Sequence, residues 1–81
     1  MAKYRKRPVV IDAIKWTDKT SIEKGLLKDC DCWVNQAGSL VIKTETADLY
    51  CPLGAWIIKG VEGEFYPCSA SIFEATYEKV K

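Results

Sequence analysis

The chain contains no histidine, the side chain that most often exchanges protons near neutral pH. Catalytic triads with a histidine base and metal sites that use imidazole are therefore excluded. Its glycines do not form a phosphate-binding loop, because Gly54, Gly60 and Gly63 are flanked by segments with the composition of strands and not by the start of a helix. We therefore expect a protein that binds a partner and is not an enzyme.

An excess of charge of either sign is also missing. The chain has 12 basic and 11 acidic residues, a net charge of +1. A nonspecific nucleic-acid binder normally carries a basic excess, and a protein that imitates DNA is strongly acidic, so this chain fits neither class. The one asymmetry is the basic run Lys3, Arg5, Lys6 and Arg7, which either contacts phosphate or is a solvated tail.

Long apolar runs are absent as well. The longest is residues 55–58, whereas roughly 18 residues are needed to cross a bilayer. Nothing resembles the apolar segment of a signal peptide. We therefore expect a soluble, cytoplasmic protein in a compartment that disfavours disulfides.

The length and composition predict one small globular domain. The chain has 81 residues, of which 48% are hydrophobic and 28% charged. We assign residues 1–81 to this domain and expect the basic arm, residues 1–7, to be flexible. A core of this size provides on the order of 3–5 kcal/mol of net stability, so a structural metal would be a useful support.

The hydrophobic pattern predicts an α+β fold, mostly an antiparallel β-meander with one short helix. Residues 9–16 form a β-branched run with apolar residues on both faces, which predicts a central strand. Residues 20–23 have the pattern of a capping box and predict a helix over 20–28. Ser69 can cap a helical turn near 70–75, and residues 77–80 are expected to form an edge strand. Further strands are expected over residues 32–36, 39–45, 49–51, 56–59 and 64–68.

Four cysteines, Cys30, Cys32, Cys51 and Cys68, are numerous for a small domain in a reducing compartment. Four thiolates satisfy the tetrahedral preference of Zn²⁺. In an extended segment the spacing of Cys30 and Cys32 points both sulfurs to the same side. Cys51 and Cys68 each adjoin a proline at a strand end, a rigid position that suits a metal ligand. The sequence therefore predicts one Zn²⁺ held by all four cysteines.

Two alternatives to zinc stay open. Free cysteine is often buried and behaves as a small apolar residue, and disulfides would also account for an even number of thiols. If zinc is bound, four sulfur ligands leave no position for an activated water. The metal would then be structural and not catalytic.

Three segments of the chain resemble a widespread group of small phage and prophage proteins of Gram-positive bacteria. They are residues 3–13 (KYRKRPVVIDA), 54–68 (GAWIIKGVEGEFYPC) and 72–78 (IFEATYE), which together cover over a third of the chain. Ala55 stands where that family usually has an acidic residue. Cys68 matches a cysteine common in the group, whereas Cys30, Cys32 and Cys51 are additions in this chain.

This resemblance implies an inhibitor of a host defence protein that acts in the bacterial cytoplasm. Small non-enzymatic phage proteins are often of this kind, and the implied partner is the type II CRISPR effector nuclease, as for type II-A anti-CRISPR proteins. The near-neutral charge implies that the protein would cover protein surface and hinder the loading of target DNA, without imitating DNA. The alternatives are a nucleic-acid-associated accessory protein that uses the basic arm, a phage structural or interaction protein, and a small enzyme or ligand-binding module.

Aromatic side chains are the expected anchors of such a contact. Trp33, Tyr50 and Tyr66 are the candidate partner-binding residues, because exposed aromatics often dominate the energy of protein interfaces. Packing in the core remains an equal alternative for Trp33 and Tyr66, and it is the favoured role of Trp16 and Trp56.

Overall fold

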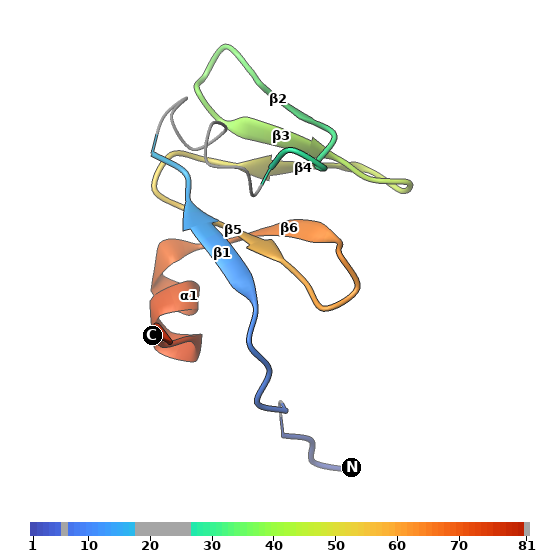
Figure 1. The fold of residues 1–81 in the computed structure, drawn as a ribbon, viewed down its shortest axis with the longest axis vertical. Coiled ribbons are helices and arrows are strands. Elements are labelled where there is room, and N and C mark those ends of the chain that lie inside the picture. The colour runs from blue at the N-terminus through green and yellow to red at the C-terminus, as the bar shows by residue number, and fades with distance from the viewer. Residues whose placement is uncertain (6, 18–26, 81) are drawn as a thin grey trace.

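The computed structural model describes residues 1–5, 7–17 and 27–80, which fold into two antiparallel sheets and a short helix (Figure 1). This arrangement confirms the α+β class. Sheet A has the strand order β1 (Asp12–Lys15), β5 (Trp56–Lys59) and β6 (Phe65–Cys68). Sheet B has the order β2 (Cys32–Val34), β3 (Leu40–Lys43) and β4 (Asp48–Cys51). The helix α1 (Ala70–Thr76) follows β6.

Sheet A lies between sheet B and α1, so its two faces are covered by different partners (Figure 1). Alternate residues of a strand point to opposite faces. The face that carries Ile14, Ile57 and Phe65 packs into the core shared with sheet B. The opposite face carries Trp56, on which the helix residue Phe73 stacks with ring centroids 4.1 Å apart.

Trp16 connects the two sheets. Directly after β1, its backbone continues the pairing with the β5 side of the sheet: its N–H donates to the Ala55 carbonyl at 2.8 Å, and its own carbonyl accepts from the Gly54 N–H at 2.7 Å. Its side chain is fully buried, and the indole N–H donates to the Gly38 carbonyl in the β2–β3 hairpin at 2.9 Å. One residue therefore holds hydrogen bonds to both sheets.

The turn of the β2–β3 hairpin places the Gly38 carbonyl where Trp16 can reach it. The Asn35 side-chain oxygen accepts from the backbone N–H groups of Ala37 and Ser39, both at 3.0 Å. Gly38 has a φ of +86°, which favours glycine because no Cβ then clashes with the backbone. The predicted turn at residues 37–38 is thus confirmed, and its carbonyl lies within reach of Trp16.

The predicted helical turn near residues 70–75 is a seven-residue helix. The hydroxyl of Ser69, its N-cap, accepts from the Ile72 N–H at 3.4 Å, as the sequence predicts. The helix ends at Thr76, and the ring of its C-cap, Tyr77, stacks on Phe73 with centroids 5.0 Å apart. Trp56, Phe73 and Tyr77 form a continuous aromatic stack on sheet A.

Two strand predictions are wrong. Residues 9–16 were expected to form a central strand, but β1 lies at the edge of sheet A. β1 has Ile14 on the core side and Ala13 on the α1 side, together with the exposed Asp12 and Lys15. Apolar residues on both faces of the run therefore do not require a central position. The described residues 77–80 form no strand, because the Tyr77 ring continues the stack over the sheet face instead of extending its edge. The predicted helix over 20–28 lies largely outside the described residues, and Leu27–Asp29 form a turn.

Trp16 and Trp56 both bury their indole N–H, and a comparison of the two tests the Trp16 hydrogen bond directly. The Trp56 indole N–H is buried and has no hydrogen-bond partner among the described residues. We expect Trp16→Phe to lower the free energy of unfolding by about 1–3 kcal/mol, since it removes a donor from the Gly38 carbonyl. Trp56→Phe removes an unpaired donor and keeps the stack on Phe73, so its cost should be clearly smaller. Denaturant unfolding measures both, and equal losses would contradict this role of Trp16.

Candidate functional site

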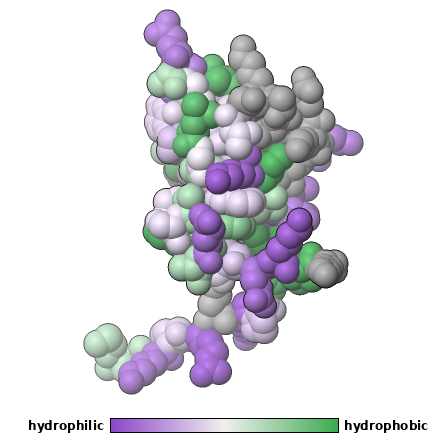
Figure 2. Space-filling view, turned by 90° about the vertical axis from the view of Figure 1, so that its left-hand side faces the viewer, coloured by the Kyte–Doolittle hydropathy of each residue, from purple (hydrophilic) through white to green (hydrophobic). Residues whose placement is uncertain are grey.

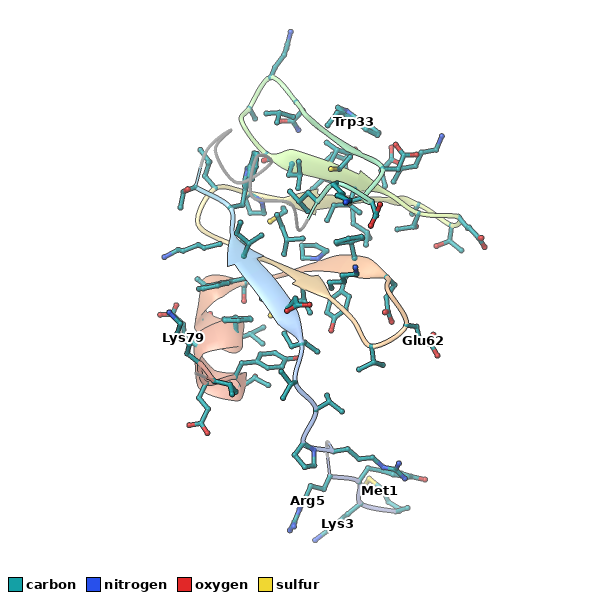
Figure 3. The ribbon with its side chains drawn as sticks, in the orientation of Figure 1. Met1, Lys3, Arg5, Trp33, Glu62 and Lys79 are labelled. Atoms are coloured by element: carbon teal, nitrogen blue, oxygen red, sulfur yellow. The ribbon has the colours of Figure 1, made fainter. Side chains whose placement is uncertain are left out.

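The outer face of sheet B, away from sheet A, presents a row of large side chains across its three strands. In the strand register Trp33 of β2 lies opposite Val41 of β3, which lies opposite Tyr50 of β4. Trp33 is 45% exposed and Tyr50 is 59% exposed, whereas Val41 between them is 2% exposed. Figure 3 shows Trp33 on this outer side. We call Trp33, Val41 and Tyr50 the aromatic row.

Strand alternation determines this placement. Leu40 and Ile42 point into the core, so Val41 must point outward, and the burial of Cys51 turns Tyr50 outward in the same way. Cross-strand contacts between aromatic and β-branched side chains stabilise a sheet. The row is therefore held on paired strands and not on loops. Val41 was not among the candidate contact residues, although the Leu40–Ile42 alternation could have identified it.

Both signs of charge flank the aromatic row. Lys43 and Asp48 are paired in the register next to it, and both are exposed. Asp31, also exposed, continues the same line, because its carbonyl accepts from the Lys43 N–H at 2.8 Å. One cation between two carboxylates does not attract phosphate. The surroundings of the row thus favour a protein surface as its partner.

A shallow hollow begins at the Tyr50 end of the row. Its volume is about 520 Å³, and its wall is mostly apolar. Leu53, 54% exposed, and Pro52 lie between Tyr50 and the far side of the hollow, where Cys68 and Ala70 contribute. The apolar surface next to the row is therefore wider than the two aromatic rings alone.

Tyr66, the third candidate contact residue, lies elsewhere. It is partly buried on the α1 side of sheet A. Burial and a hydrogen bond with Tyr77 raise the pKa of its hydroxyl. The structure thus brings two of the three predicted contact residues together, Trp33 and Tyr50, and places Tyr66 on a different face. Trp56, for which a core role was favoured, is half-buried and stacks on Phe73 on the α1 side of sheet A, outside the core between the sheets.

The four cysteines occupy several places in the fold. Cys51 is fully buried between the sheets, and its thiol lies 3.8 Å from the Trp56 carbonyl and 3.9 Å from the Pro52 carbonyl. Cys32 is on the same face of sheet B, but β3 separates it from β4, and Leu40 and Ile42 fill the space along this face. The sulfur of Cys51 is therefore surrounded by apolar side chains and backbone carbonyls.

Cys30 and Cys32 do lie together, as their spacing predicts. Their thiols interact directly, and the Cys32 thiol donates weakly to the Cys30 carbonyl at 3.6 Å. Cys68 is on the α1 side of sheet A, paired in register with Trp56. Within residues 1–5, 7–17 and 27–80, no three histidine, cysteine or acidic side chains are grouped to hold a metal. Binding of one zinc by all four cysteines would require these strands to rearrange, and it stays a prediction for metal analysis.

Two of the thiols also lack the activation that nucleophilic chemistry needs. Burial raises the pKa of Cys51 to about 11. Burial and the neighbouring Cys32 thiol raise the pKa of Cys30 to about 12. Since the thiolate is the reactive form, both remain protonated at neutral pH. This supports a structural role for Cys51 and for Cys30.

Comparison of the chain with protein-family models, with curated proteins and with solved structures finds no match. In the part of the chain that the structure describes, no helix is long and apolar enough to span a membrane. The site is therefore interpreted from its own geometry.

A pair of substitutions at Cys51 separates a metal ligand from a buried thiol. If Cys51 is a packing residue, Cys51→Ala should cost less unfolding free energy than Cys51→Ser, because serine buries a hydroxyl among apolar side chains. If Cys51 holds zinc, both variants should release the metal and lose similar stability. Elemental analysis and thermal unfolding, each with and without chelator, measure this. Stoichiometric zinc in the unchanged chain, lost in both variants, would contradict the packing role.

Proposed function

We propose that the protein is a binding module that inhibits a partner protein by covering part of its surface with the aromatic row. The observation that carries this proposal is the exposure of Trp33 and Tyr50 on the same face of a paired three-stranded sheet, with Val41 between them. Tryptophan and tyrosine are enriched among the residues that dominate interface energies. Their position on strands keeps the entropy cost of binding low, because little backbone has to be ordered.

The surface next to the row supports the same role. The hollow beside Tyr50 offers apolar area for a protruding side chain of the partner. The exposed Lys43, Asp31 and Asp48 can form a polar rim that fixes orientation. Such a patch recognises shape and apolar contact more than charge.

For the identity of the partner, we propose the type II CRISPR effector nuclease. The support is the resemblance to small phage proteins together with the net charge of +1. A nearly neutral inhibitor neither imitates DNA nor competes for it, so it would hinder the loading of target DNA by covering the nuclease surface. The exposed basic residues Lys3 and Arg5 on the N-terminal arm (Figure 3) keep direct DNA contact as the competing function.

Titration with the guide-loaded nuclease tests the row. We expect Trp33→Ala and Tyr50→Ala each to weaken binding about tenfold or more, as the loss of a central aromatic anchor does. Tyr4→Ala is the matched control, because Tyr4 is 94% exposed on the arm and outside the row. All three variants should keep the fold, which circular dichroism verifies, although Trp33→Ala and Tyr50→Ala lose a cross-strand contact with Val41 and should unfold somewhat more easily.

Two outcomes would contradict the proposed function. Affinity that falls steeply between low and moderate salt would show that charge, and not apolar contact, drives association. A shift of free DNA by the protein in the absence of nuclease would favour the competing function. No association with the nuclease would overturn the choice of partner.

A further inference from the structure

A second apolar surface lies at the other end of the molecule, along β1. A groove of about 450 Å³ runs between this strand and the α1 side of the fold. Its wall includes the exposed Val9 and Val10, Ala13 of β1, and the stack of Trp56, Phe73 and Tyr77. The wall is mostly apolar, although the charged residues Asp12, Lys15, Glu78 and Lys79 also line it, and the groove follows the direction of the strand.

The strand beside this groove is an edge. In the described residues β1 pairs with β5 on one side only. Backbone groups of an antiparallel strand alternate between its two neighbours. Because Trp16 donates its N–H to Ala55 on the β5 side, Ile14 and Asp12 also bond toward β5, and the N–H and C=O of Ala13 point to the open edge. An edge of this kind is a template for another strand.

The arm that precedes β1 carries charge of one sign, whereas the groove wall itself has both signs. Residues 1–5 and 7–11 precede β1 without helix or strand and run away from the body of the protein (Figure 2). Lys3, Arg5 and Arg7 on this arm are exposed. A strand that pairs with β1 and continues past its N-terminal end would run into these cations.

We propose that this edge binds an extended segment of a partner protein, which adds to sheet A as a fourth strand antiparallel to β1. The segment has apolar residues at alternate positions, which enter the groove, and an acidic stretch on its C-terminal side, which meets the arm. Antiparallel addition matches every strand pair of sheet A. Main-chain bonds supply affinity and alternate side chains supply specificity in this mode of recognition.

This surface is independent of the proposed function. The aromatic row is on the outer face of sheet B, whereas the groove is on sheet A and α1. The two surfaces can therefore be occupied separately. Trp33→Ala, which damages the row, is expected to leave binding at the groove unchanged.

The probe is a fluorescein-labelled peptide of alternating valine and serine that ends in a run of glutamates, titrated by anisotropy. Ala13→Pro is the decisive variant: it removes the N–H at the open edge without removing a bond to β5, and proline is tolerated at edge strands. We expect it to lower affinity about tenfold. Ala13→Ser, which keeps the N–H, should stay within about twofold.

The arm is tested by charge exchange. Arg5→Glu combined with Arg7→Glu should weaken binding of the glutamate-ended peptide, and a lysine-ended peptide should regain affinity for this variant. A peptide of the same composition with its valines clustered tests whether apolar residues are needed at alternate positions. It should bind weakly, because fewer of its valines can enter the groove. Should Ala13→Pro fail to fold, hydrogen exchange of the unchanged chain replaces it: the Ala13 amide gains protection on binding, whereas the Ile14 amide, already bonded, does not.

Three results would overturn the proposal. They are the absence of binding by the glutamate-ended peptide, equal affinity of the Ala13→Pro and Ala13→Ser variants, and equal binding of the clustered peptide. The last result would mean that the arm attracts acidic chains by charge alone.

Discussion

The fold depends on one buried tryptophan that belongs to one sheet and bonds to the other. Trp16 directly follows β1 and continues its pairing with the β5 side of sheet A, and its indole N–H donates to the hairpin carbonyl of Gly38 in sheet B. A three-stranded sheet is stable when its hydrophobic face is covered, and each of these sheets has its face covered by the core that they share. The Trp16 ring contributes to the apolar area between them together with residues such as Leu40 and Ile57, and its N–H helps to fix their relative position. The Asn35 turn, which presents the Gly38 carbonyl, is thus part of the same constraint.

Fixing the two sheets against each other determines which surfaces remain for binding. The inner faces of both sheets are buried in the shared core, and the Trp56–Phe73–Tyr77 stack covers part of the α1 side of sheet A. Among the described residues, two of the surfaces that stay open are the outer face of sheet B and the edge at β1. The first presents side chains and suits a surface of fixed shape. The second presents backbone groups and suits an extended chain. Their different chemistry follows from the same layered packing.

The sequence predicts many of the individual strands, turns and caps, but it predicts little of the strand order and of which strand face meets the core. The strand at residues 56–59, the turn at 37–38 and the Ser69 cap rest on short-range patterns, and all three are confirmed. The edge position of β1 depends on which strand pairs with β5, which is a long-range choice. Exposure of Trp33 and burial of Trp16 follow from the same choice, since only register decides which face of each strand meets the core. The pairing of the thiols of Cys30 and Cys32 was local and therefore predictable, but the positions of Cys51 and Cys68 were not.

The net charge of +1 conceals a separation of charge that the fold makes visible. Lys3, Arg5 and Arg7 are at one end of the molecule on the arm before β1, whereas Asp31 and Asp48 flank the aromatic row of sheet B. A total near zero therefore excludes a uniform field but not local complementarity. The outer face of sheet B carries both signs of charge, and the groove at β1, whose wall also has both signs, adjoins the basic arm. Salt screens the interaction between exposed charges beyond a Debye length of roughly 8 Å, so each surface attracts a partner through the charges close to it. Partners that differ in charge can accordingly bind the two surfaces without competing.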